Sequence, residues 1–185
     1  MADKTSVSVV LGQSSGLRYS DPDYQALRVA TAILGSGFTG RLMANVRDLE
    51  GLTYDVGASL GNDMFNDGDW KISASFSPAL LERGIASTRR QLKLWYDAGA
   101  TSAEIEARKS NLIGSFKVAL ATTDGMADAL LAAVNRGYDV NWLDDFPVKI
   151  NALSNDQVNG AIRKYLKPDS MFLIKAGTLP APEKK

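Results

Sequence analysis

Histidine and cysteine are both absent from the 185-residue sequence. Protein zinc sites almost always use imidazole or thiolate ligands, so we expect no zinc hydrolysis by a usual route from this chain alone. The same absence excludes histidine-assisted serine or cysteine nucleophiles. It also excludes disulfide bonds, and the cellular compartment therefore stays open.

The sequence has no excess charge of either sign and no long apolar run. Its 21 Lys and Arg residues balance 21 Asp and Glu residues, which argues against nucleic acid or a membrane surface as partner. The apolar runs are shorter than the ~20 residues of a membrane-spanning helix. Because 45% of the residues are hydrophobic, a sizeable core is expected. We predict a single domain over residues 1–185, with a disordered polar tail from about residue 179.

Four stretches have β-strand character. Residues 69–76 alternate cleanly between apolar and polar side chains, which indicates one buried sheet face and favours antiparallel pairing. The other stretches are rich in β-branched or apolar residues between turn signals. The strands are predicted at Thr5–Leu11, Leu52–Leu60, Asp69–Phe76 and Met171–Lys175.

Helical periodicity fills much of the remaining sequence. Asp21, Thr39 and Asp124 are predicted helix caps, and capping-box patterns begin at Thr101 and Ser154. The helices are predicted from Asp21 to Gly35, from Thr39 to about Glu50, from Ser77 to Gly99, from Thr101 to about Leu120, from Asp124 to near Gly137, over Trp142–Ile150 and after Ser154. The predicted helix from Asp124 to near Gly137 carries Ala127, Leu130, Leu131 and Val134. The fold class is α+β, an antiparallel-rich sheet with helices packed on one face.

A glycine-rich stretch, Gly35–Gly40, matches the G-x-G-x-x-G pattern of dinucleotide-binding folds. Those folds need a strand directly before the motif and a helix directly after it. Here a predicted helix precedes the motif, so we favour a tight helix-to-helix corner. Nucleotide binding is the weakest of the functions considered.

Several carboxylates are close enough in the sequence to consider acid/base or metal chemistry. Residues 63–69 resemble a calcium loop only loosely, because the regular alternating oxygen ligands and the closing glutamate are missing. We interpret all of these carboxylates as solvated turns and helix faces. The pairs are Asp48 with Glu50, Asp63 with Asp67, and Asp144 with Asp145.

Arg47 and Tyr54 flank a predicted turn at Glu50 and Gly51. The arginine is predicted near the end of a helix and the tyrosine at the start of a strand. The spacing alone favours an ordinary solvent-facing arginine and a half-buried tyrosine.

The stretch Leu34–Tyr54 resembles the signature of the C-terminal half of insulinase-type (pitrilysin/mitochondrial processing peptidase) zinc metallopeptidases. Its Leu-Gly-Ser-Gly start, Gly-Arg-Leu step, Val-Arg pair and final Gly-Leu-Thr-Tyr carry the likeness. Asp23–Leu27, the Gly99–Glu106 region with Lys109, and Leu153–Val158 extend it. The resemblance covers about residues 7–177, with Gly-Ser-Gly in place of the common triple glycine.

This resemblance implies half of a clamshell. In the family, one half binds zinc through H-x-x-E-H and a distal glutamate, and the other half supplies an arginine and a tyrosine seven residues later. By resemblance, Arg47 and Tyr54 would bind the substrate backbone and stabilise the oxyanion. The implied partners are a complementary H-x-x-E-H half and a peptide substrate. Zinc would lie in that half, and no cofactor in this chain, which should be inactive alone.

The alternative function is a non-catalytic structural or scaffold subunit of the same family. The presence of both Arg47 and Tyr54 favours the peptidase role, because a scaffold has no reason to keep the pair.

Overall fold

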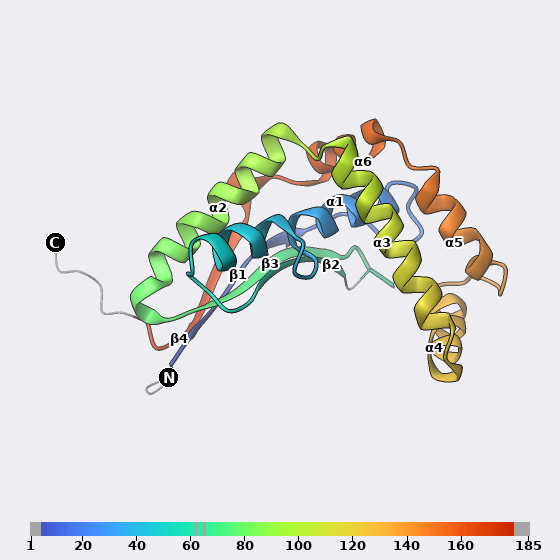
Figure 1. The fold of residues 1–185 in the computed structure, drawn as a ribbon, viewed down its shortest axis with the longest axis horizontal. Helices are drawn as coiled ribbons and strands as arrows, with labels where there is room; N and C mark the ends of the chain where they lie inside the picture. The colour runs from blue at the N-terminus through green and yellow to red at the C-terminus, as the bar shows by residue number, and fades with distance from the viewer. Residues whose placement is uncertain (1–4, 62, 65, 180–185) are drawn as a thin grey trace.

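A four-stranded antiparallel sheet, ordered β2-β3-β1-β4, forms the base of the fold (Figure 1). The computed structural model describes residues 5–61, 63–64 and 66–179. The strands are β1 (Val7–Ser14), β2 (Val56–Gly61), β3 (Asp69–Phe76) and β4 (Phe172–Gly177). The central strand β1 pairs with β3 and with β4, so segments far apart in the sequence lie side by side.

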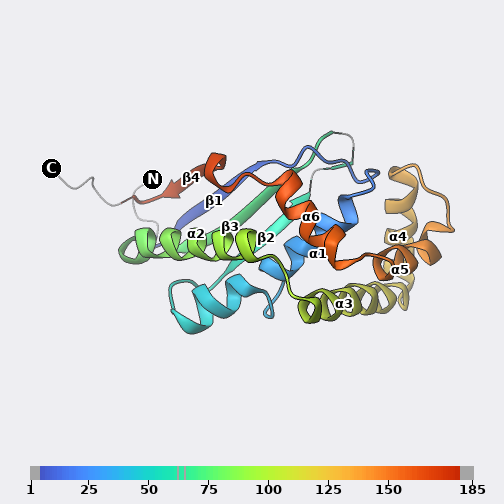
Figure 2. The same cartoon turned by 90° about the horizontal axis from the view of Figure 1, so that it is seen from above.

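The helices follow the predicted order closely. They are α1 (Tyr24–Gly35), η1 (Met43–Leu49), α2 (Leu81–Ala98), α3 (Ser102–Leu120), α4 (Thr123–Asn135), α5 (Trp142–Asn151) and α6 (Asn155–Tyr165), with short 3-10 turns η2 (Pro78–Leu80) and η3 (Pro168–Ser170). Figures 1 and 2 show α1, α2 and α6 covering one face of the sheet, while α3, α4 and α5 extend past one end. The predicted α+β class is confirmed.

The core lies between the sheet and the covering helices. The apolar positions of β3 that alternate along the strand are buried, as predicted. The Trp70 ring stacks on Trp95 of α2 at 6.2 Å between ring centroids, and its indole nitrogen donates to the Thr31 hydroxyl at 2.8 Å. The opposite sheet face carries exposed small residues such as Ser8, Ser59 and Ser73. The sequence alternation therefore sets which face receives the helices.

Helix starts are predicted correctly where a capping box is present. Thr101 and Ser154 each accept from the backbone nitrogen three residues later and complete the reciprocal bond. The prediction is wrong for α4, where the Thr122 side chain accepts from the Gly125 nitrogen and Asp124 lies inside the first turn.

The other two predicted caps are also wrong. The Asp21 carboxylate accepts from the Arg18 backbone nitrogen at 2.7 Å, closing a turn before α1 begins at Tyr24. The Thr39 hydroxyl accepts from the Arg108 guanidinium at 3.1 Å instead of capping the helix that follows. Each side-chain oxygen therefore accepts a hydrogen bond from a donor outside the helix that it was predicted to cap.

β2 begins later than predicted, and two apolar residues of α4 face outward. β2 begins at Val56 and not at Leu52. The Thr53 hydroxyl donates a hydrogen bond to the Asp55 carbonyl at 2.9 Å, and this bond stabilises a turn before the strand. In α4, Leu131 is 60% and Val134 is 67% exposed, whereas Ala133 is buried. Apart from Leu179, the tail predicted to be disordered lies outside the described residues. None of the helices in the described ranges is long and apolar enough to cross a membrane.

Candidate functional site

The glycine-rich corner brings the end of α1 against β2. Gly35, the last residue of α1, lies so close to the strand that a Cβ there would be 2.3 Å from the Ala58 nitrogen. Gly37 has φ +66°, a conformation that side chains other than glycine rarely adopt. Because α1 leads into the motif, the predicted helix-to-helix corner is confirmed. The glycines here serve close packing and chain reversal.

Arg47 lies on η1, a short π-helical segment that follows this corner. The Glu50 nitrogen donates to the Asn45 carbonyl, five residues back, at 3.0 Å. Gly51, with φ +62°, ends the segment, and its nitrogen donates to the Arg47 carbonyl at 2.9 Å. The wider π-helical winding is rare in proteins, and where it occurs it is frequently at a functional site.

Ion pairs fix both ends of the helical segment that carries Arg47. At the start, Arg41 binds both carboxylate oxygens of Glu104 on α3, each at 2.7 Å, and these hydrogen bonds lower the pKa of Glu104 to about 2. At the end, Glu50 accepts from Ser87 at 2.7 Å and from Arg90 at 2.6 Å, both on α2. The Ser87 bond is the main cause of a lowered pKa at Glu50. Charge-assisted bonds are stronger than neutral ones, so they fix the helix against two others.

The structure places Arg47 and Tyr54 in contact. The Arg47 guanidinium carbon lies 4.9 Å from the Tyr54 ring centroid and 5.3 Å from the Phe38 ring centroid. Both distances permit cation–π attraction. The Arg47 Nε is also 3.8 Å from an Asp48 oxygen, a weak ion pair. Tyr54 is 83% exposed and precedes β2, so the prediction that it begins the strand is wrong, and it is not the half-buried tyrosine that spacing alone favours.

An open cavity of about 190 Å³ surrounds this pair. Its lining comes from the glycine corner, η1 and the first residues of the edge strand β2. The lining residues are Gly35, Gly37, Phe38, Met43, Arg47, Tyr54, Asp55, Val56 and Gly57. The Arg47 guanidinium and the Tyr54 phenol therefore line a cavity that lies next to the backbone of the edge strand β2.

Phe38 is the site residue that sequence reasoning missed. It is 74% exposed although phenylalanine is usually buried. The available signal was its position in a glycine-rich corner, where no helix or strand face can cover it.

Five of the six carboxylates considered in the sequence bind cations or hydroxyls. Asp67 pairs with Arg18 at 3.2 Å, and Asp145 pairs with Lys149 at 3.2 Å. Asp63 is buried and accepts from the Tyr24 hydroxyl, so its assignment to a solvated turn is wrong. Across the described ranges, no group of three or more His, Cys, Asp or Glu residues could hold a metal ion.

A structure described as the peptidase M16 inactive domain from Pseudomonas fluorescens aligns with a TM-score of 0.84 and 28% identity, over 98% of this chain and 43% of that chain. The inactive peptidase domain of a protein proposed to be a zinc protease, from Bordetella parapertussis, aligns with a TM-score of 0.78 and 19% identity, over 95% of each chain. A periplasmic protease from Escherichia coli aligns with a TM-score of 0.76 and 15% identity, over 97% of this chain and 20% of that chain.

The chain thus spans less than half of the Pseudomonas chain that it matches. A comparison with curated protein sequences finds no match. The family profile of the peptidase M16 inactive domain matches residues 2–112, more than half of the chain. This match confirms the resemblance to the C-terminal half-domain of zinc metallopeptidases that the sequence motif indicated. The chain belongs to the peptidase M16 inactive domain family.

Proposed function

We propose that this chain is the substrate-binding, transition-state-stabilising half of a zinc metalloendopeptidase. It would act in a clamshell with a complementary half that carries H-x-x-E-H. The observation that carries the proposal is the contact between the half-buried Arg47 guanidinium and the exposed Tyr54 ring in the lining of a cavity. Polar side chains that contact each other in the lining of an open cavity are suited to a ligand that arrives from outside.

In this proposal, zinc held by the complementary half supplies the activated water. The residues of this chain would bind and orient the peptide. The Tyr54 hydroxyl and the Arg47 guanidinium would donate hydrogen bonds to the peptide carbonyl as negative charge develops on its oxygen. Such donors stabilise the transition state more than the ground state, and removing one can lower kcat by about 10²–10³.

Phe38 and the backbone of β2 extend the proposed binding surface. The Phe38 ring limits where the Arg47 guanidinium can move, which preorganises the donor. β2 is the edge strand next to the cavity, and an extended peptide can add a strand to such an edge through main-chain hydrogen bonds. We therefore expect the bound peptide to run along β2 past Arg47.

The test is peptidase activity on a mixed peptide pool, with zinc, for this chain alone and for this chain mixed with an H-x-x-E-H half encoded beside it. We expect activity only in the mixture, with Arg47→Ala and Tyr54→Phe both strongly reduced. Arg163→Ala, an exposed arginine on α6, is the matched control and should retain activity.

Two outcomes would contradict the proposal. Activity from this chain alone would show a catalytic site that the proposal lacks. A stable complex of the two halves without activity would favour the scaffold role, since assembly would then be intact and chemistry absent.

A further inference from the structure

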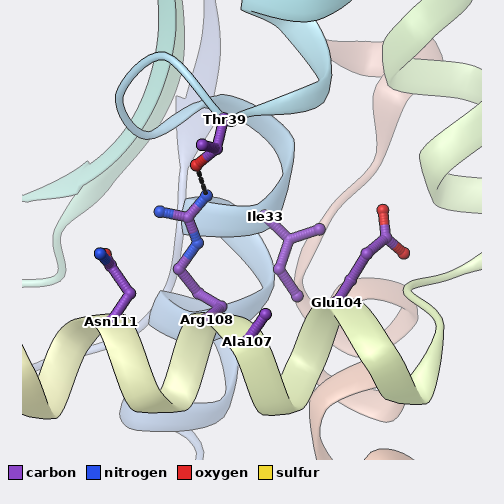
Figure 3. A pocket seen from close by; sticks show the side chains of 6 residues that line it. All are labelled: Ile33, Thr39, Glu104, Ala107, Arg108 and Asn111. Carbon is purple, nitrogen blue, oxygen red and sulfur yellow. Dashed lines mark hydrogen bonds between the residues drawn. The ribbon is translucent and has the colours of Figure 1, made fainter.

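A second cavity, of about 280 Å³, lies on the α3 side of the glycine-rich corner (Figure 3). It is bounded by the end of α1, the corner itself and the first half of α3. The lining residues are Ile33, Thr39, Glu104, Ala107, Arg108 and Asn111. None of them belongs to the Arg47 cavity, so this is a separate candidate site.

Arg108 is the unusual member of this lining. It is only 9% exposed, and its one hydrogen bond in the described part of the chain is the donation from Nη2 to the Thr39 hydroxyl at 3.1 Å. Figure 3 shows its other terminal nitrogen turned toward the Asn111 side of the cavity. A guanidinium has five N–H donors and stays charged in proteins, so most of its donors are left to solvent or to a ligand in the cavity.

The neighbouring carboxylate does not neutralise Arg108. Glu104 lies four residues earlier on α3, the spacing at which a glutamate and an arginine usually pair on a helix. Both of its oxygens are instead bound by Arg41, and one also accepts from the Thr101 nitrogen at 2.8 Å. No ion pair to Arg108 occurs within residues 5–61, 63–64 and 66–179, and burial lowers its pKa.

Taking a charge out of water without a partner is costly, which makes an anionic ligand the natural complement. We propose that this cavity binds a singly charged carboxylate that carries a small apolar group. The Arg108 guanidinium would take the carboxylate oxygens in a forked pair of hydrogen bonds, and the Asn111 amide would add a third. Ile33 and Ala107 would contact the apolar group. A doubly charged phosphate matches the site less well, because the single guanidinium of Arg108 carries only one positive charge.

The proposal can be tested on the isolated chain without a zinc-binding half, so its outcome is independent of the peptidase proposal. Calorimetric titration would compare N-acetyl-leucine, its neutral amide, the α-amide of N-acetyl-aspartate, and inorganic phosphate. We expect a dissociation constant of about 1 mM or tighter for at least one carboxylate. The neutral amide should bind at least about tenfold more weakly. The leucine compound mimics a peptide terminus and the aspartate compound an acidic side chain, so the tighter of the two identifies the source.

Arg108→Met is the critical variant, with Arg163→Met on α6 as the exposed control. We expect at least about tenfold loss of carboxylate affinity in the first and none in the second. Arg108→Met should fold, because methionine fills similar space and replacing an unpaired buried charge is often neutral or stabilising. Urea unfolding checks this, and Asn111→Leu gives a second variant with weakened binding.

Three results would overturn the proposal. The first is the absence of saturable carboxylate binding to the unmodified chain. The second is equal binding by Arg108→Met and the unmodified chain, which would place the ligand elsewhere. The third is tighter binding of phosphate than of either carboxylate, which would contradict the match to a singly charged ligand.

Discussion

Gly35→Ala should destabilise the chain although it improves the helix propensity of α1. The added Cβ would lie 2.3 Å from the Ala58 nitrogen and 2.8 Å from the Ala58 Cβ. Backbone atoms cannot rotate away as a side chain can, so α1 and β2 would have to separate. Overpacking of this kind costs about 1–3 kcal/mol, and the contact with backbone places it at or above the upper end. Alanine recovers about 1 kcal/mol of helix propensity.

The expected net loss is therefore about 2 kcal/mol, equivalent to a fall of roughly 4–8 °C in Tm for a chain of this size. The matched control is Gly114→Ala, inside α3, where an added Cβ has no neighbour within 4 Å. That variant should gain about 0.5–1 kcal/mol. Urea and thermal unfolding of both variants measure the difference. If Gly35→Ala were as stabilising as Gly114→Ala, the close approach of α1 to β2 would be refuted.

Arg41 holds the pKa of Glu104 at about 2, below its ordinary 4.5, so the ion pair contributes fully above pH 4.5 and is lost as the pH falls toward 2. Glu104→Gln should therefore show a smaller loss of urea stability between pH 5 and pH 3, and an equal loss would contradict the ion pair. Thr122→Ala should cost about 1 kcal/mol in thermal unfolding and Asp124→Ala much less, because only the threonine caps α4. Phe38→Leu should weaken peptide binding to the reconstituted enzyme by several-fold. Because the Phe38 ring is exposed, Tm should stay unchanged. Unchanged peptide affinity would show that Phe38 is not part of the site.

The sequence predicts the fold where the signal is local. Alternation along residues 69–76 gives β3 and its buried face, and capping boxes give the starts of α3 and α6. Periodicity alone does not say what an apolar face contacts. The outward position of Leu131 and Val134 on α4 is therefore invisible in the sequence.

The candidate site depends on contacts between distant residues. Arg41 and Glu104 are 63 positions apart, and their pairing fixes the helix that carries Arg47. The turn at Thr53 delays β2 and leaves Tyr54 exposed. Residue spacing could not reveal either feature. Arg47 and Tyr54 were singled out through the family resemblance, while the contact of Phe38 with Arg47 became visible only in the folded chain.

The most direct test of the central proposal is the kcat of the reconstituted enzyme with Tyr54→Phe in this chain. The substitution keeps the ring against the Arg47 guanidinium and removes only the hydroxyl, and Tyr54 is exposed, so folding and assembly should be unaffected. We predict a fall in kcat of about 10²–10³ with an unchanged affinity between the halves. A kcat equal to that of the unmodified enzyme would contradict the assignment of Tyr54 to transition-state stabilisation.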